Sequence, residues 1–183
     1  MLRHLPNALS GLRLLAAPAL AFLLVDGAYA YAFALFALAG LSDAVDGYLA
    51  KRLAPDSRFG AYLDPAADKL LMLAAFLTLT RLGVVPLWLT ALVIARDIAI
   101  VAALILIRTL ALAVPMSPLP VGKLNTAVQV GYIALVLMDL AFRLEVPGLL
   151  SAAAILTAVV TAVSWIAYGQ VLIRALVLRR RTA

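Results

Sequence analysis

The sequence lacks cysteine, has a single histidine and is poor in charge. Charged side chains make up 13% of its 183 residues and hydrophobic side chains 66%, whereas soluble domains carry about 25% charged residues. The absence of cysteine excludes disulfides and leaves the redox compartment undetermined. A mean hydropathy of +1.10 with so little charge is typical of an integral membrane protein.

What the sequence does contain is a series of six apolar runs. Each is long enough to cross a bilayer, which takes about 20 helical residues, and the segments between them carry the glycine, proline and serine that mark turns. The runs cover approximately residues 9–25, 28–50, 61–80, 87–107, 124–142 and 148–178. We therefore predict an all-α integral membrane protein with six transmembrane helices, in a single domain that covers residues 1–183.

Basic residues fall mainly on one side of these spans. If the N-terminus is cytoplasmic, the outer segments hold Arg81 and Arg143, beside Asp26 and Glu145, and the other cations of the loops fall inside. This is the positive-inside bias, and it predicts that both termini lie in the cytoplasm. Cations near the inner surface also attract anionic lipid headgroups. The excess of 15 Lys and Arg over 9 Asp and Glu therefore requires no nucleic-acid partner.

The N-terminal segment gives an expectation about the host membrane. The polar stretch RHLPNALSGLR begins the first helix, and no clear small-residue cleavage site follows its apolar run. We therefore expect a retained helix rather than a signal peptide. The chain also starts without a transit-like extension, which favours a bacterial inner membrane over a mitochondrial one.

Four aspartates interrupt the apolar sequence around the loop between the second and third runs. Asp43 and Asp46 are three residues apart, and Asp64 and Asp68 are four apart, so each pair lies on one face of its helix. A short loop forces the two helices together. If these faces turn toward each other, four carboxylates share one small volume near one membrane surface. Because carboxylates in a membrane helix are costly, they suggest a functional site.

Such a cluster suits metal ions and phosphate. Neighbouring carboxylates repel unless a cation neutralises them, and oxygen ligands without histidine or cysteine favour Mg²⁺ or Mn²⁺ over zinc. The aspartates could hold one ion or two, and a pair of ions about 4 Å apart would clamp a phosphoryl group. In the same stretch, Gly47 and Ala50 leave space for a ligand. Gly60 opens the next helix with free amides, which suit anionic oxygens. Lys51, Arg52 and Arg58 supply cations for phosphate.

Other interpretations of these residues stay open. The aspartates could be solvated helix caps, or could line a proton or cation path. Transporters, however, tend to place ionisable groups near the bilayer midplane, often on broken helices. Here both pairs lie near one surface, and Pro65 is expected in the first turn of its helix, where proline is tolerated. The pattern therefore favours an enzyme over a transporter. Asp139 and His4 are interpreted as surface groups.

The stretch resembles a known family signature. It is similar to the motif of the CDP-alcohol phosphotransferases, six-helix membrane enzymes that are usually dimeric. The matching residues are Asp43, Asp46, Gly47, Ala50, Gly60, Asp64 and Asp68. The resemblance implies that the four aspartates bind Mg²⁺ or Mn²⁺, and that Asp68 also deprotonates the acceptor alcohol.

The resemblance also implies where the nucleotide binds. Gly47, Lys51 and Ser57 stand where family members contact the CDP moiety, and Ala50 and Gly60 line that pocket. Lys51 departs from the family pattern, which has arginine there, so a bidentate fork becomes a point charge. The reaction implied is attack of an alcohol on the diacylglycerol-linked phosphorus of CDP-diacylglycerol, with CMP leaving.

Segments outside the signature indicate a branch of the family. LPNALSGLRLLAAP, GAYLDPAADK, ARD, VGKLNTAVQ and WIAYGQ are similar to the phosphatidylglycerophosphate synthase and cardiolipin synthase branches. The stretches RD, KLNTAVQ and WIAYGQ are closer to the CMP-forming cardiolipin synthases, in which the acceptor is phosphatidylglycerol. Glycerol 3-phosphate is the alternative acceptor.

Either acceptor needs cations for its phosphate. Lys123 and Arg96 are the candidates, and a structural pairing of Arg96 with an intramembrane carboxylate is the alternative. Asn7 and Ser10, with Arg13, could complete the nucleotide or lipid entrance from the first helix.

Overall fold

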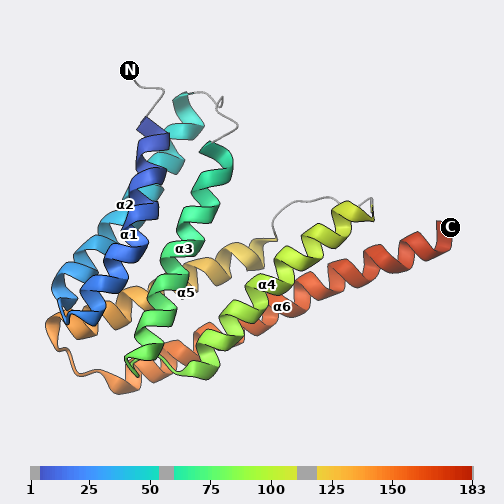
Figure 1. Ribbon diagram of the computed structural model, residues 1–183. Coiled ribbons are helices and arrows are strands. Elements are labelled where there is room, and N and C mark those ends of the chain that lie inside the picture. Colours follow the sequence, from blue (N-terminus) through green and yellow to red (C-terminus); the bar gives the residue numbers. More distant parts are fainter. Residues whose placement is uncertain (1–4, 54–59, 111–118, 183) are drawn as a thin grey trace. The chain divides into compact units, whose positions relative to one another are not determined.

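The described chain is entirely helical. The computed structural model describes residues 5–53, 60–110 and 119–182, and within them the side chains of residues 14–42, 68–110 and 119–177. These residues contain no strand. They form α1 (Leu5–Val25), α2 (Tyr29–Leu53), α3 (Gly60–Arg81), α4 (Leu87–Thr109), α5 (Pro120–Phe142) and α6 (Pro147–Thr182) (Figure 1). The predicted all-α class and six helices are confirmed for the part of the chain described.

The helix boundaries lie close to the predicted runs. The largest differences are four residues, at the starts of α1 and α5 (5 for 9, 120 for 124) and at the end of α6 (182 for 178). The expected place of Pro65 is wrong, since α3 begins at Gly60 and Pro65 is its sixth residue, in the second turn. The helix nevertheless continues through it, which membrane helices tolerate.

Three helices of the described part are long and apolar enough to cross a membrane. They are Leu87–Thr109, Pro120–Phe142 and Pro147–Val177, judged by length and composition. Shorter apolar stretches cover Leu14–Val25 in α1 and Tyr29–Ser42 in α2. The crossing of all six helices and the orientation of the termini remain predictions.

Glycine ends α1 and α3 in the same way. Gly27 and Gly83 have φ angles of 76° and 75°, in the left-handed region that strains other residues. After α3, the N–H of Gly83 donates to the carbonyl of Thr80, and that of Val84 to the carbonyl of Leu79, both at 3.0 Å. The same pair of bonds surrounds Gly27. Both helices therefore end in a Schellman motif, which explains the turn signals in the sequence.

The chain divides into two compact units. The first contains residues 1–85 and 133–146, hence α1, α2, α3 and the last part of α5. Its helix α1 packs against both α2 and α3, and the three helices lie side by side (Figure 1). The buried core of this unit, among its described side chains, is apolar and includes Leu20, Leu24, Phe36, Phe76, Leu79, Ile133 and Leu137.

Asp139 is a structural residue of the first unit. Its Oδ1 accepts a hydrogen bond from the N–H of Val146 at 3.3 Å, and its side chain is half-buried. The intervening loop holds Arg143 and Glu145 at φ angles of 53° and 54°, which is strained for residues other than glycine. Asp139 is thus a partly exposed group, as interpreted, whose carboxylate also ties this loop to the end of α5.

The second unit contains residues 86–132 and 147–183, hence α4, the first part of α5, and α6. Helices α4 and α6 pack against each other along their length (Figure 1). Apolar residues of this unit's core include Leu89, Val93, Ile107, Ala154 and Ala175. This core also contains polar side chains, whereas the buried side chains described in the first unit are apolar.

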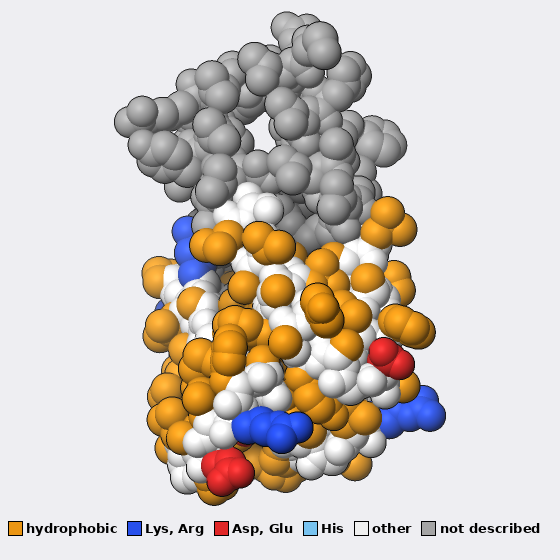
Figure 2. Space-filling model, turned by 90° about the vertical axis from the view of Figure 1, so that its left-hand side faces the viewer, with side chains coloured by type: hydrophobic (Ala, Val, Ile, Leu, Met, Phe, Trp, Pro, Cys, Tyr) orange, Lys and Arg blue, Asp and Glu red, His pale blue; other side chains and the backbone are white. Residues whose placement is uncertain are grey.

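Every described helix carries large hydrophobic side chains on its surface. Phe22 of α1 is 69% exposed, Tyr31 of α2 73% and Ile98 of α4 64%. Figure 2 shows such side chains over most of the described part of one face, with few charged side chains among them. Contiguous apolar surface of this kind is rare on soluble proteins and suits contact with lipid.

Candidate functional site

The aspartate motif lies on two uninterrupted helices of the first unit. Asp43 and Asp46 belong to α2, and Asp64 and Asp68 belong to α3. Because each pair lies within one helix at a spacing of three or four, the members of each pair share a helical face. The side chain of Asp68 is half-buried, and those of the other three lie outside the described side chains.

The backbone brings these segments to one end of the first unit. In Figure 1, the end of α2 and the start of α3 lie at the same end as the start of α1. That start carries Asn7 and Ser10. The helix segments that carry the aspartates therefore lie at one end of this unit, and the convergence of the four carboxylates stays a prediction.

The remaining residues of the predicted nucleotide site lie in the same region of the chain. Gly47, Ala50 and Lys51 belong to the last turns of α2, and Gly60 is the first residue of α3. Ser57 and the side chain of Lys51 lie outside the described residues. The roles of all these residues therefore stay predictions.

The donor chemistry of the aspartate segments fits a hard divalent cation. Four carboxylates on two helices offer oxygen ligands only, and such ligands suit Mg²⁺ or Mn²⁺. The described side chains contain no group of three or more histidine, cysteine, aspartate or glutamate residues that could hold a metal. Those side chains include only Asp68 of the four aspartates, so the fit to a divalent cation rests on the kind and spacing of the donor residues.

A seam of polar side chains runs through the core of the second unit. Seven polar or charged residues are buried in the described chain, and all belong to this unit: Thr90, Arg96, Asn125, Gln129, Thr157, Thr161 and Ser164. They come from α4, α5 and α6, whose surfaces are otherwise largely apolar. Buried polar groups in a membrane helix are rare and mark functional or interhelical contacts.

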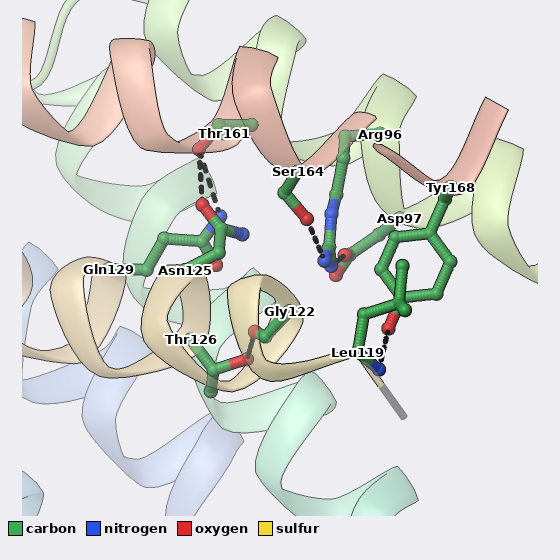
Figure 3. Close-up of polar contacts among 10 residues, drawn as sticks. All are labelled: Arg96, Asp97, Leu119, Gly122, Asn125, Thr126, Gln129, Thr161, Ser164 and Tyr168. Atoms are coloured by element: carbon green, nitrogen blue, oxygen red, sulfur yellow. Dashed lines mark hydrogen bonds and ion pairs between the residues drawn. The ribbon is translucent and has the colours of Figure 1, made fainter. Parts of the chain in front are cut away.

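Arg96 of α4 is the charged centre of this seam. It is 6% exposed. Its Nη1 donates to Oδ1 of Asp97 at 2.7 Å, and its Nη2 donates to Oγ of Ser164 on α6 at 2.6 Å (Figure 3). Its Nε is buried with no hydrogen-bond partner among the described residues. The predicted pairing of Arg96 with an intramembrane carboxylate is therefore confirmed, and the buried Nε–H is left for a further acceptor.

Tyr168 of α6 links Arg96 to the start of α5. The guanidinium carbon of Arg96 lies 5.6 Å from the centre of the Tyr168 ring, within the range of a cation–π contact. The Tyr168 hydroxyl accepts a hydrogen bond from the N–H of Leu119 at 3.3 Å (Figure 3). A single side chain of α6 thus contacts both neighbouring helices.

A second polar group joins α5 to α6 further along the seam. Thr161 Oγ1 donates to Oδ1 of Asn125 at 2.8 Å, and it accepts from Nε2 of Gln129 at 3.4 Å (Figure 3). Asn125 and Gln129 are one turn apart on α5, so one hydroxyl bridges both. The Asn125 amide nitrogen is buried without a partner among the described residues.

Lys123 lies at the start of α5 and is exposed. The structure therefore leaves it accessible to a ligand, although it does not test the predicted role.

Sequence reasoning missed Ser164, Tyr168, Asn125 and Thr161. One signal was available: polar residues follow one face of α6 at positions 157, 161, 164 and 168, a spacing of four, three and four that keeps them in line on a helix.

Comparison with known proteins gives a family match over nearly the whole chain. The sequence model described as CDP-alcohol phosphatidyltransferase matches residues 3–177. This range includes the aspartate motif and the polar seam.

Curated proteins similar to this chain include a cardiolipin synthase, a probable phosphatidylglycerophosphate synthase and a phosphatidyltransferase. Human cardiolipin synthase (CMP-forming) is 35% identical over 146 residues, which cover 71% of this chain and 48% of the human protein. The probable phosphatidylglycerophosphate synthase of Mycobacterium tuberculosis is 36% identical over 172 residues, covering 90% of this chain and 80% of that protein. The CDP-diacylglycerol–glycerol-3-phosphate 3-phosphatidyltransferase of Bacillus subtilis is 36% identical over 111 residues, covering 60% of this chain and 56% of that protein. The match thus spans about half the length of the human relative.

Proposed function

Because the chain belongs to the CDP-alcohol phosphatidyltransferase family, we propose that it transfers the phosphatidyl group of CDP-diacylglycerol to an alcohol. The family resemblance inferred from the aspartate motif is thereby confirmed, and so is the class of enzyme. The relatives named above are synthases or a transferase, which gives no support to the transport hypothesis. Three apolar helices and the family make the chain an integral membrane protein.

The observation that carries the proposal is the aspartate motif on α2 and α3. In the proposed step, the acceptor hydroxyl oxygen forms a bond to the diacylglycerol-linked phosphorus, the bond from that phosphorus to CMP breaks, and CMP leaves. The Asp68 carboxylate takes the hydroxyl proton. Asp43, Asp46, Asp64 and Asp68 would hold Mg²⁺ or Mn²⁺, and such an ion supplies positive charge that stabilises the phosphoryl oxygens.

The other predicted residues have proposed roles in substrate binding. Gly47, Lys51 and Ser57 contact the CDP moiety, and Ala50 and Gly60 line its pocket. Asn7 and Ser10 complete the entrance from α1. Arg96 and Lys123 bind the acceptor phosphate, and the support for Arg96 is its buried Nε–H, which has no partner among the described residues.

For the acceptor, we favour phosphatidylglycerol, which would give cardiolipin. The stretches KLNTAVQ and WIAYGQ support this choice, as does the similarity to the human synthase. Glycerol 3-phosphate is the second candidate, because the relative named as a probable phosphatidylglycerophosphate synthase aligns with 90% of this chain.

The setting of the enzyme is also proposed. We place six membrane-crossing helices in a single domain of residues 1–183, with both termini and the active site on the cytoplasmic side of a bacterial inner membrane. The basic residues of the inner loops support this orientation. A homodimer is proposed by family resemblance.

An acceptor panel tests the proposed reaction. Purified protein in lipid bicelles receives CDP-diacylglycerol, Mg²⁺ or Mn²⁺, and one of phosphatidylglycerol, glycerol 3-phosphate, inositol phosphate or serine. We expect CMP release only with an acceptor, and most with phosphatidylglycerol. A preference for glycerol 3-phosphate would move the proposal to the second candidate, and no CMP with any acceptor would overturn it.

Asp68→Asn tests the proton acceptor. An amide cannot take the hydroxyl proton, so we expect the CMP release rate to fall by at least about 100-fold, while much of the nucleotide binding remains. The matched control is Asp26→Asn, an exposed aspartate just after α1, which should release CMP at the normal rate. Normal turnover of the Asp68 variant would remove this residue from the role.

A further inference from the structure

Tyr168 has two contacts that hold two different helices. On one side its ring lies 5.6 Å from the guanidinium carbon of Arg96. A tyrosine face attracts a cation at this distance, and more strongly where water is excluded. Asp97 and Ser164 bond the two terminal nitrogens of Arg96. The ring adds a third contact, which further restricts the plane of the guanidinium and hence the direction of its Nε–H.

On the other side, Tyr168 holds the residue before α5. Its hydroxyl accepts the N–H of Leu119 at 3.3 Å. The carbonyl of Leu119 in turn accepts the N–H groups of Gly122 at 2.9 Å and Lys123 at 3.4 Å. The backbone of Lys123 is therefore bonded to the residue that Tyr168 fixes.

The fit between Tyr168 and the first turn of α5 is close. A Cβ atom added to Gly122 would lie 2.6 Å from the Tyr168 hydroxyl oxygen and 3.2 Å from a ring carbon. Real Cβ atoms essentially never lie under 3.0 Å from another heavy atom, so an alanine at this position would require the Tyr168 side chain to shift. The seat of the ring is thus defined by Gly122 on α5 and by Arg96 on α4 (Figure 3).

We propose that Tyr168 is a positioning residue that fixes both cations of the acceptor site, Arg96 and Lys123. The inference rests on the proposed function, in which these two cations bind the acceptor phosphate. Tyr168 holds the Arg96 plane through its ring, and it holds the Lys123 backbone through its hydroxyl and Leu119. It aligns the groups that bind the acceptor and touches no reacting atom.

Two variants separate the two contacts. Tyr168→Phe keeps the ring beside Arg96 and removes the hydroxyl, whereas Tyr168→Leu removes both. We expect the KM for the acceptor to rise about threefold in the Phe variant and about tenfold in the Leu variant. These values follow from the usual strengths of a hydrogen bond and a cation–π contact. The KM for CDP-diacylglycerol and kcat should change less than twofold, or about 0.4 kcal/mol.

The split between the two KM values separates positioning from folding. Loss of folded protein lowers the maximal rate with every substrate and leaves both KM values unchanged. The matched control is Tyr31→Leu on α2, where the tyrosine is 73% exposed, and its acceptor KM should stay at the wild-type value. Should the Leu variant fail to fold, the Phe variant still carries the test.

The outcomes distinguish this inference from the proposed function. If the wild-type protein releases CMP and both Tyr168 variants keep its acceptor KM, the positioning role is wrong and the proposed function stands. The positioning role is also wrong, and the proposed function stands, if the KM for the acceptor and the KM for CDP-diacylglycerol rise equally. If the wild-type protein releases no CMP with any acceptor, the proposed function fails and the positioning role with it. A rise confined to the acceptor, larger for Leu than for Phe, supports the inference.

Discussion

Gly122 is a glycine with little room. Of the glycines whose surroundings the structure describes, it is the one at which an added Cβ would meet another group, the Tyr168 side chain at 2.6 Å. At Gly131, in the same helix, an added Cβ would meet nothing within 4 Å. A change to alanine adds the same methyl group to the same helix at both positions, so the two variants differ chiefly in what that methyl group meets.

We predict that Gly122→Ala is less stable than Gly131→Ala by about 1–2 kcal/mol. The new methyl group forces Tyr168 to move, which weakens its bond to Leu119 and its contact with Arg96. At Gly131 alanine favours the helix over glycine by about 1 kcal/mol at most. The free energy of unfolding in mixed detergent and lipid micelles measures the difference. Equal stability of the two variants would show that Tyr168 moves without loss.

Arg96 shows how far single residues could be interpreted from sequence. A pairing with an intramembrane carboxylate was one of two open interpretations, and the structure shows this pairing with Asp97. The bond to Ser164 and the contact with Tyr168 join residues 68 and 72 positions apart. Nothing local to Arg96 encodes them, because they depend on which face of α6 turns toward α4.

Helix α6 combines two faces of different chemistry. One face carries exposed Ile155, Val159 and Ile166, and the opposite stripe carries buried Thr157, Thr161 and Ser164. Thr161 bonds side chains of α5, whereas Thr157 bonds the carbonyl of Ala153 in its own helix at 2.8 Å. The two threonines are equally buried, at 0% exposure, so they differ chiefly in whether the bond joins two helices.

We predict that Thr161→Val destabilises the protein by about 1 kcal/mol, because it removes two interhelical bonds and such bonds in membranes contribute about 0.6 kcal/mol each on average. Valine keeps the shape of the side chain and leaves Asn125 and Gln129 without their shared partner. Thr157→Val is the control and should cost less, because only a bond within α6 is lost. Unfolding in mixed micelles compares both variants with the wild type. A loss for Thr157→Val as large as that for Thr161→Val would contradict the interhelical role.

The extent of the helices could be predicted from sequence because two strong signals coincide. Apolar runs of membrane length give the interior of each helix, and Gly27, Gly83, Pro86 and Pro147 mark where helices end or begin. The facing of the helices could not be predicted, since hydrophobic periodicity is weak where nearly every face is apolar. For this reason the aspartate motif was found by its spacing, and the seam around Tyr168 was missed.

Polar chemistry is divided between the two units of the chain. The first unit holds the aspartate motif on α2 and α3 and has an apolar core among its described side chains. The second unit holds all seven of the buried polar side chains in the described chain. In the proposed function, the first unit provides the metal ligands and the proton acceptor, and the second provides the cations for the acceptor. Variants of the second unit should therefore change acceptor preference with little effect on CDP-diacylglycerol.

The orientation of the whole chain in the membrane can be tested without removing native thiols, since the sequence contains no cysteine. Single cysteines replace exposed Leu82 and Leu144, in segments expected outside, or exposed Thr109, in a segment expected inside. The basic residues that favour the predicted orientation stay in place. We expect a membrane-impermeant maleimide to label L82C and L144C in bacterial spheroplasts, and T109C only after the membrane is permeabilised. Labelling of T109C alone in intact spheroplasts would show that the orientation is the reverse of the predicted one. In the predicted six-helix topology the aspartate motif would then lie outside the cell, where cytoplasmic CDP-diacylglycerol headgroups could not reach it.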